Sequence, residues 1–220
     1  MGVPIVVYIH VCQLPKWQIP FQKIMTALKE SGLYDRCQEI RLGIVNEQSG
    51  PIDESLFNET KITTKFYNHC SLYERATLSH MRNMSENESC QYAYLHTKGI
   101  KPLNGPCEHE KNCVLDWIDL MLHWNIYNWK IASEKLFKND IYGCEFFRNP
   151  KLHFSGNFWW ANSDYLKTLP RLNKYNVANL NRGEFWILSE TDKVYAVSGP
   201  TPVDMYQNYY HKAEDFPSGW

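Results

Sequence analysis

Ile5–Cys12, IVVYIHVC, is an almost uninterrupted run of apolar and β-branched residues near the start of the chain. Such a run is typical of a strand that is buried on both faces of a sheet. The next segment, Phe21–Leu33, has apolar side chains close to helical spacing, with Gly32 where a helix would end. Ile40–Val45 has the composition of a second strand. Strands that alternate with helices in this way predict an α/β fold, a Rossmann-type and mostly parallel sheet flanked by helices on both faces.

The rest of the chain continues the alternation. We expect strands at Lys65–Asn68 and Tyr92–Leu95, and a helix from Ser71 to Met84, where Ser71 followed by Glu74 matches a capping box. The later elements are expected as a loop at Lys101–Asn112, a long amphipathic helix at Cys113–Phe137, strands at Ile141–Cys144, Leu152–Ala161 and Lys193–Val197, and short helices at Asp164–Leu169 and Glu184–Leu188. No repeat or linker interrupts the pattern, so we expect one domain over residues 1–220.

Composition narrows the class of protein. A hydrophobic content of 44% with 21% charged residues is ordinary for a globular chain, and the formal net charge of −1 gives no basic field for nucleic acid. No apolar run approaches the length of a transmembrane helix. The 7 cysteines are odd in number and scattered, which favours free thiols in a reducing compartment over a disulfide framework. We therefore expect a cytoplasmic protein.

The predicted topology points to one edge of the sheet as the binding site. In open α/β sheets, ligands bind beyond the carboxyl ends of the strands. That rule selects His10–Cys12, Asn46–Glu47, Asn68–Cys70 and His96–Gly99. The sequence has no GxGxxG, GxxxxGK[ST] or GxSxG motif, which argues against a dinucleotide-binding domain, a P-loop enzyme and an α/β-hydrolase.

The segment after the strand at Tyr92–Leu95 has side chains suited to a phosphate group. Lys98 could supply a point charge to a diphosphate, and Gly99 would let the backbone approach it. His96 could donate to a phosphate oxygen or bind a metal. The alternative is an ordinary surface lysine in a turn.

Leu152–Ala161, LHFSGNFWWA, combines a histidine, a hydroxyl, a glycine, a carboxamide and four Phe or Trp residues. Aromatic rings beside small polar groups are suited to recognising a sugar, because the rings cover its C–H face and the polar groups bind its hydroxyls. Gly156 inside a strand also indicates the close approach of a ligand or of another backbone. The alternative is an aromatic core strand with a bulge at the glycine.

Together these segments resemble a known family. Tyr94–Gly99 (YLHTKG), Asp116-Trp117, His153–Ala161 and Arg182–Trp186, with Tyr73–Thr77 in support, are similar to motifs of small glycosyltransferases found in bacteria and large DNA viruses, which resemble the GT-A nucleotide-sugar transferases. The resemblance implies a nucleotide-diphosphate-sugar donor, with a UDP-sugar as the first candidate. The donor would be held by the half of the chain at about 1–100, and a glycan or glycoprotein acceptor by the half at about 101–220.

The resemblance also implies roles for individual residues. The base and ribose of the donor would lie beside His10, Val11, Cys12 and Asn46, and the diphosphate beside His96, Thr97, Lys98 and Gly99. The sugar and acceptor pocket would be formed by His153, Ser155, Gly156, Asn157, Trp159 and Trp160.

An inverting transfer needs a carboxylate that deprotonates the acceptor hydroxyl. Glu184, with Arg182 nearby, is the first candidate for this base, and Asp116 is the reserve. The structural alternative for Glu184 is a carboxylate that stabilises the start of a helix. Where many GT-A enzymes have an Asp-x-Asp that holds Mn²⁺ or Mg²⁺, this chain has His96-Thr97-Lys98. Either His96 and a distant carboxylate bind a divalent cation, or Lys98 replaces its charge.

Three other readings of the sequence stay open. A non-enzymatic carbohydrate-binding module would use the same aromatic wall, and a different nucleotide-dependent transferase would use a similar sheet. Cys107, His109 and Cys113 could form part of a zinc cluster, although their spacing matches no strong pattern. His211, beside several tyrosines, could belong to a C-terminal lid over the diphosphate.

Overall fold

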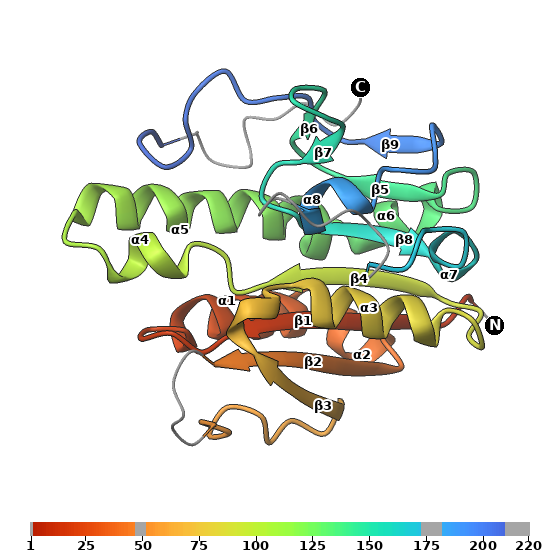
Figure 1. Ribbon diagram of the computed structural model, residues 1–220, viewed down its shortest axis with the longest axis horizontal. Helices are drawn as coiled ribbons and strands as arrows, with labels where there is room; N and C mark the ends of the chain where they lie inside the picture. Colours follow the sequence, from red (N-terminus) through yellow and green to blue (C-terminus); the bar gives the residue numbers. More distant parts are fainter. Residues whose placement is uncertain (1, 47–51, 173–181, 210–220) are drawn as a thin grey trace.

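A seven-stranded sheet forms the centre of the computed structural model, which describes residues 2–46, 52–172 and 182–209 (Figure 1). Its strands, in spatial order, are β3 (Ile62–His69), β2 (Glu39–Asn46), β1 (Ile5–Cys12), β4 (Gln91–His96), β8 (Trp159–Asn162), β5 (Ile141–Gly143) and β9 (Val194–Ala196). β8 runs antiparallel to both of its neighbours, and every other neighbouring pair is parallel. The predicted α/β fold with a mostly parallel sheet is confirmed.

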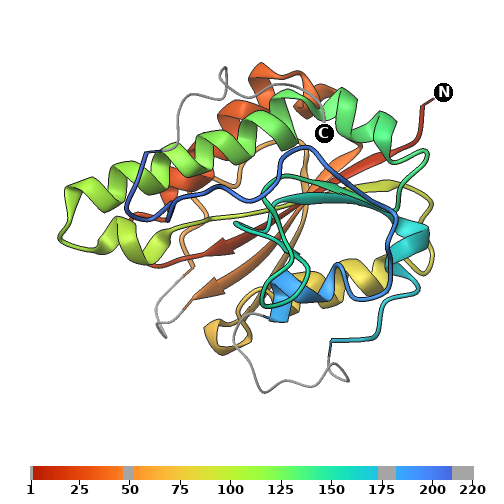
Figure 2. The same ribbon diagram turned by 90° about the horizontal axis from the view of Figure 1, so that it is seen from above.

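Helices cover both faces of the sheet (Figure 2). One face carries α1 (Gln18–Glu30), α2 (Leu33–Arg36), α5 (Glu108–Leu122), the π-helical turn η2 (His123–Tyr127) and α6 (Trp129–Lys135). The other face carries α3 (Arg75–Met84), α7 (Ser163–Leu166) and α8 (Arg182–Trp186). The remaining elements are the 3₁₀ turn η1 (Cys70–Leu72), α4 (Ile100–Asn104) and the two-stranded β6 (Phe146–Phe147) and β7 (His153–Phe154).

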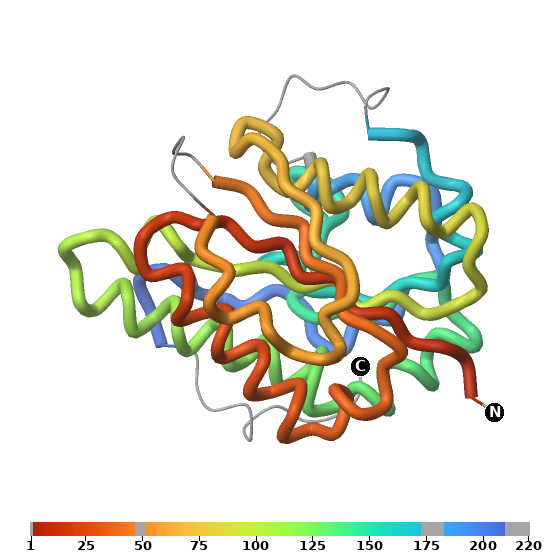
Figure 3. The backbone as a smooth tube through the Cα atoms, turned by 90° about the horizontal axis from the view of Figure 1, so that it is seen from below, coloured from red at the N-terminus to blue at the C-terminus, as the bar shows by residue number. Residues whose placement is uncertain are grey.

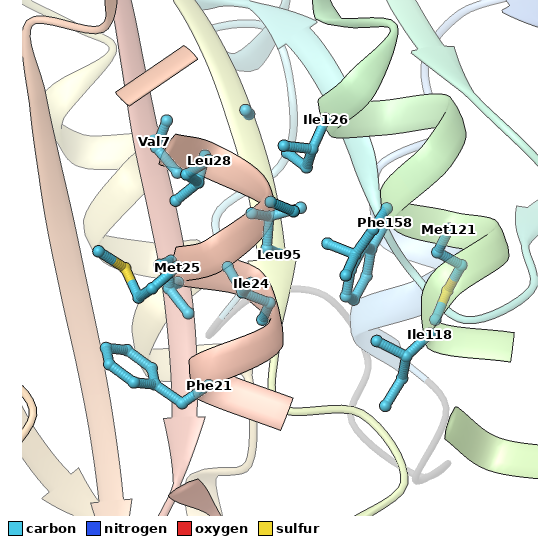
Figure 4. Close-up of a cluster of buried hydrophobic side chains, with 14 of the residues drawn as sticks. Val7, Phe21, Ile24, Met25, Leu28, Leu95, Ile118, Met121, Ile126 and Phe158 are labelled. Atoms are coloured by element: carbon cyan, nitrogen blue, oxygen red, sulfur yellow. The ribbon is translucent and has the colours of Figure 1, made fainter. Parts of the chain in front are cut away.

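The run Ile5–Cys12 divides its side chains between the two faces, as a strand must. Val7 and Ile9 pack with α1 and α5, whereas Val6 and Tyr8 pack with α3. Figure 4 shows the first of these two cores, where Leu28 of α1 lies beside Val7 and Phe21 packs into the same core further along the helix. Because both alternate sets of side chains are buried, the sequence of the strand is apolar without a break.

The segment 152–161 is a strand, a turn and a second strand, and not the single strand that was predicted. β7 and β8 are separated by a turn in which Gly156 has φ +89° and Asn157 has φ +56°. A Cβ atom on Gly156 would lie 2.2 Å from the sulfur of Met121. The glycine is therefore required by a left-handed backbone and by a packed side chain of α5, and its place is explained without a ligand.

Trp159 and Trp160 do not form the predicted sugar-binding wall. Both side chains are 0% exposed and point to opposite faces of the sheet. Trp159 stacks on Tyr94 with ring centroids 4.8 Å apart, and Trp160 donates from Nε1 to the carbonyl oxygen of Asn125 over 2.9 Å. The aromatic-core alternative is correct for this pair, because alternation within a strand buries one ring under each layer of helices.

Three other boundaries differ from the predictions. The expected loop 101–112 contains α4 and the first turn of α5. The expected helix 113–137 is interrupted by the π-helical turn η2, where the carbonyl of Asn125 bonds to Trp160 and the Asn125 amide donates to the Met121 carbonyl. The Ser71–Glu74 capping box does not form, because α3 begins at Arg75 and Glu74 turns toward the end of β4.

Glu145, between β5 and β6, is a carboxylate that is 1% exposed. It accepts hydrogen bonds from the backbone N–H and hydroxyl of Thr201 and from the hydroxyl of Ser198. These bonds tie the segment after β9 to the end of β5. Burial raises the pKa of Glu145 to about 7, although the hydrogen bonds from Thr201 and Ser198 oppose the rise.

No helix within the described ranges is long and apolar enough to span a membrane.

The Gly156→Ala variant should be strongly destabilised, because Ala would strain the φ of +89° and collide with Met121. We expect a loss of roughly 2–4 kcal/mol, which for a chain of this size lowers the melting temperature by about 5–10 °C. Gly199→Ala is the matched control, because no atom lies within 4 Å of a Cβ placed there. Equal melting temperatures for the two variants in a thermal scan would contradict this account of the turn.

The Glu145→Gln variant tests the buried carboxylate. With its folded-state pKa raised to about 7, Glu145 binds its proton more tightly in the folded protein than in the unfolded chain. Its contribution to stability therefore falls as the pH rises through that range. We expect the stability of the variant relative to the natural chain to increase by roughly 2–3 kcal/mol between about pH 5 and about pH 8. Denaturant unfolding measures this difference in the free energy of unfolding at each pH. A difference that stays constant between about pH 5 and about pH 8 would contradict the raised pKa of Glu145.

Candidate functional site

A cavity of about 230 Å³ opens at the carboxyl ends of β1, β2 and β4, the edge of the sheet that the topology predicts for ligand binding. Its lining consists of His10, Cys12, Leu14, Val45, Cys70, Tyr73, Glu74, His96, Thr97, Lys98, Gly99, Ile100, Lys101, Pro102 and Tyr206. In Figure 1 this is the edge from which β4 continues into α4.

Parallel pairing of β1 with β4 fixes the centre of the cavity. His10 and His96 are partners in the register, so both histidines lie at the same level of the sheet. The chain after β4 is then held against β1, because Thr97 donates its N–H to the His10 carbonyl and accepts from the Cys12 N–H on its hydroxyl, each over 2.9 Å. Gly99 turns the chain into α4 with φ +73°, and Val114 leaves no room there for a Cβ atom.

Glu74 is the carboxylate of the cavity. One carboxylate oxygen, Oε2, accepts from the Tyr94 hydroxyl over 3.0 Å and from the Asn157 amide over 2.5 Å. The other oxygen, Oε1, lies 3.7 Å from Nδ1 of His96. Burial by itself raises the pKa of Glu74, but electrostatic interactions with His96 and His10, which strengthen when these rings are protonated, and the Tyr94 hydrogen bond together hold this pKa below its usual range.

The two histidines have different partners. Nε2 of His96 bonds to the Gly156 carbonyl oxygen over 2.8 Å, and Nδ1 of His10 bonds to the Thr77 hydroxyl over 2.9 Å. Burial lowers the pKa of both rings, to about 4 for His10, although Glu74 opposes the shift in each. The cavity is therefore lined by neutral imidazoles near neutral pH.

Lys98 brings a buried ammonium group to the cavity. The residue is 8% exposed, and its Nζ lies 4.2 Å from the ring centroid of Trp117 and 5.7 Å from that of Tyr206. Within the described part of the chain, this Nζ makes no hydrogen bond to an acceptor and no ion pair within 4.0 Å. The aromatic rings stabilise the cation, but they leave its capacity to donate to an anion unused.

The segment around Tyr206 closes one side of the cavity. It lies along α4 and α5, as Figures 2 and 3 show. His109 of α5 bonds to the Gln207 carbonyl over 2.7 Å, and Trp117 contacts Tyr206 edge-on with ring centroids 5.1 Å apart. His211, the predicted lid residue, lies outside the described residues.

The structure brings together most of the residues that were predicted to bind the donor. His10, Cys12, His96, Thr97, Lys98 and Gly99 all line the cavity. Val11 does not, because its side chain is 0% exposed in the core beneath α1. Asn46 ends β2 next to the lining residue Val45, but it is not itself part of the lining.

The predicted acceptor residues lie behind the cavity rather than in it. The Gly156 carbonyl and the Asn157 amide contact His96 and Glu74, so this turn supports the site. His153 packs edge-on against Phe185, and the Ser155 N–H donates to the Glu145 carbonyl.

Neither of the predicted catalytic carboxylates lines the cavity. Glu184 is half-buried in α8, where burial raises its pKa and the charges of Lys98 and His153 oppose the rise. Asp116 is a half-buried residue on α5.

Sequence reasoning missed Glu74, Tyr73, Lys101 and Tyr206 as lining residues. Glu74 was assigned to a helix cap, although it follows the edge strand β3 and belongs to a segment that resembles the family. Its distance along the chain from Tyr94 and Asn157 hides the contacts that give it a role. Tyr206 gives no signal in the sequence beyond the abundance of tyrosine near it.

The possible zinc site at Cys107, His109 and Cys113 is not supported. Within residues 2–46, 52–172 and 182–209, no three His, Cys, Asp or Glu side chains are close enough together to hold a metal ion. His109 contacts the Cys113 sulfur at 3.5 Å, but its Nε2 also bonds to the Gln207 carbonyl, and Cys107 is exposed.

No protein-family model and no curated protein sequence matches the chain. Solved structures match over nearly the whole length. The 4-diphosphocytidyl-2C-methyl-D-erythritol synthase of Anaerococcus prevotii DSM 20548 is similar with a TM-score of 0.51 and 11% identity, covering 98% of this chain and 96% of that one. HddC of Yersinia pseudotuberculosis has a TM-score of 0.47 and 12% identity, covering 88% and 90%. Rv0371c of Mycobacterium tuberculosis H37Rv, in complex with manganese, has a TM-score of 0.44 and 11% identity, covering 93% and 94%. At these identities, the first match shows a shared Rossmann-like fold.

The titration of His10 tests the electrostatics of the cavity. We expect its imidazole to stay neutral down to about pH 5, because burial lowers its pKa to about 4. The unfolded chain binds this proton more readily, so stability from His10 is lost as the pH falls from its ordinary pKa of 6.5 toward 4. Two-dimensional NMR of the histidine side chains measures the midpoint directly, and a His10 midpoint near 6.5 would contradict the buried, uncharged ring.

Proposed function

We propose that the chain is a glycosyltransferase that binds a nucleotide-diphosphate sugar in this cavity and transfers the sugar to a hydroxyl group of a glycan or glycoprotein. A UDP-sugar is the first candidate donor. The resemblance of Tyr94–Gly99, His153–Ala161 and Arg182–Trp186 to the motifs of that family supports the proposal. The position of the cavity, at the carboxyl ends of parallel strands, supports it independently.

The observation that carries the proposal is the buried ammonium of Lys98. A cation that is 8% exposed is costly to bury unless an anion pairs with it. Lys98 lines the cavity, and Lys101 brings a second positive charge to the same lining. Glu74 and Glu184 interact electrostatically with Lys98, but neither forms an ion pair with it within 4.0 Å. A diphosphate placed there would accept hydrogen bonds from its Nζ. The Gly99 backbone at the start of α4 would allow its close approach.

The reaction gives each group a task. The acceptor oxygen attacks the anomeric carbon, the bond from that carbon to the diphosphate breaks, and the nucleoside diphosphate leaves with the bonding electrons. Lys98 would stabilise the negative charge that develops on the leaving diphosphate. The hydroxyl proton passes to a carboxylate, for which Glu184 and Glu74 are the candidates, because both interact electrostatically with Lys98.

His96 and Glu74 are the residues that could bind a divalent cation. One nitrogen of His96 is engaged by the Gly156 carbonyl, and the other faces Glu74. These two side chains could join a cation that the donor diphosphate also binds, or Lys98 could supply the positive charge by itself.

The fold of the Anaerococcus prevotii protein supports a second candidate. That protein is named as the synthase of a diphosphocytidyl compound, so a protein with this fold produces a nucleotide diphosphate derivative. A chain that makes such a compound would release pyrophosphate, whereas a glycosyltransferase releases a nucleoside diphosphate. The carbohydrate-binding module is less well supported, because Trp159 and Trp160 are buried in the core.

A thermal-shift screen of UDP-, GDP-, dTDP- and CMP-sugars, with and without Mn²⁺, tests the proposal. A ligand at about 100 times its dissociation constant adds roughly 2.7 kcal/mol to stability, which raises the melting temperature by several degrees. We expect one class of nucleotide to give this shift and Lys98→Met to abolish it. Lys167→Met, which removes a surface lysine paired with Asp164, is the matched control and should keep the shift.

Analysis of the reaction products then distinguishes the two transferases. Release of a nucleoside diphosphate from the selected sugar nucleotide supports glycosyl transfer, and release of pyrophosphate from a nucleoside triphosphate supports the second candidate. If free oligosaccharides raise the melting temperature and no nucleotide does, both transferase proposals fail and a binding module replaces them.

A further inference from the structure

Glu74 has one oxygen that is fully engaged and one that is available. Oε2 accepts from both Tyr94 and Asn157, which fixes the orientation of the carboxylate. Oε1 faces Nδ1 of His96 at 3.7 Å, too far for a hydrogen bond. The side chain keeps 23% of its surface exposed, and the residue lines the cavity. A substrate hydroxyl can therefore reach this carboxylate.

The hydrogen bond to Gly156 fixes the proton on His96. A carbonyl oxygen can only accept, so Nε2 of His96 must be the donor. In the neutral ring, Nδ1 then carries a lone pair, and Oε1 of Glu74 lies 3.7 Å from this nitrogen. Two acceptors thus face each other with no proton between them. The pair would gain a hydrogen bond by taking up one proton, after a movement of less than about 1 Å.

We propose that Glu74 is the catalytic residue that accepts the proton of the attacking hydroxyl, and that His96 is a positioning residue that offers this proton a second acceptor. The inference rests on the proposed sugar transfer. As the acceptor oxygen bonds to the anomeric carbon, its O–H electrons stay on that oxygen and the proton moves to Oε1. The proton is then shared with Nδ1 of His96, and the bond to the diphosphate breaks with its electrons on the leaving group.

The position of Glu74 favours it over Glu184 for this task. The titratable groups that interact with Glu74 come from several elements, namely His10 of β1, Tyr94 and His96 of β4, Lys98 after β4 and Glu184 of α8. Among the described carboxylates, only Glu74 lines the cavity together with Lys98. Glu184 follows Gly183, where a Cβ atom would lie 3.3 Å from Oε2 of Glu74, but Glu184 itself is not part of the cavity lining.

Glu74→Gln is a sharp test, because the fold can accommodate it. The carboxamide oxygen can accept from Tyr94 and Asn157, and its NH₂ group can donate to Nδ1 of His96. We expect a melting temperature and a dissociation constant for UDP-glucose like those of the natural chain. Turnover, measured as UDP released from a panel of UDP-sugars in the presence of methyl glycosides, should fall by about 10²–10⁴-fold. Glu184→Gln is the matched comparison and should lose less.

The tautomer of His96 provides a readout that does not depend on activity. Nitrogen-15 NMR of the imidazole should show a proton on Nε2 and none on Nδ1 in the natural chain at neutral pH. A proton on Nδ1 would overturn the inference, because the acceptor would already be filled. Turnover that survives in Glu74→Gln would overturn it as well. If no nucleotide sugar binds to the natural chain, the proposed function fails first and Glu74 has no part in sugar transfer, whatever the tautomer.

Discussion

The buried ammonium group of Lys98 is the feature on which the account of the cavity depends. A protein gains nothing by taking a cation out of water unless other groups compensate for the lost hydration. The rings of Trp117 and Tyr206 compensate in part, and they also hold the Nζ group in place. In the described part of the chain, no carboxylate lies within 4.0 Å of this Nζ group. A cation that is held in position and shielded from water in this way is suited to binding an anionic ligand.

The turn at Gly156 connects this site to the hydrophobic core. Met121 of α5 packs where a side chain at residue 156 would lie, so the core fixes the path of the backbone there. That path aims the Gly156 carbonyl at His96 and the Asn157 amide at Glu74. A stretch that resembles a sugar-binding wall in the sequence thus acts indirectly. It sets the tautomer of a histidine and the orientation of a carboxylate.

The sequence predicts the parts of this molecule that depend on local patterns. The runs Ile5–Cys12 and Ile40–Val45 are apolar because both faces are covered, so the parallel sheet and the edge at which the cavity opens could be predicted. The burial of Trp159 could not be predicted, because a segment with aromatic and small polar residues can have the same composition in a core strand and in a binding surface. Glu74 was missed for a related reason, since its partners are distant in the chain and a capping pattern accounted for it locally.

The most direct test of the central claim is a binding cycle that combines two proteins with two ligands. The dissociation constants of UDP and of uridine would be measured by calorimetry for the natural chain and for Lys98→Met. If Lys98 binds the diphosphate, the substitution raises the dissociation constant of UDP by about 10–100-fold, as expected for the loss of a hydrogen bond to a charged group. The dissociation constant of uridine should not change. An equal loss of affinity for both ligands, or no loss of affinity for UDP, would contradict the claim that Lys98 binds the diphosphate.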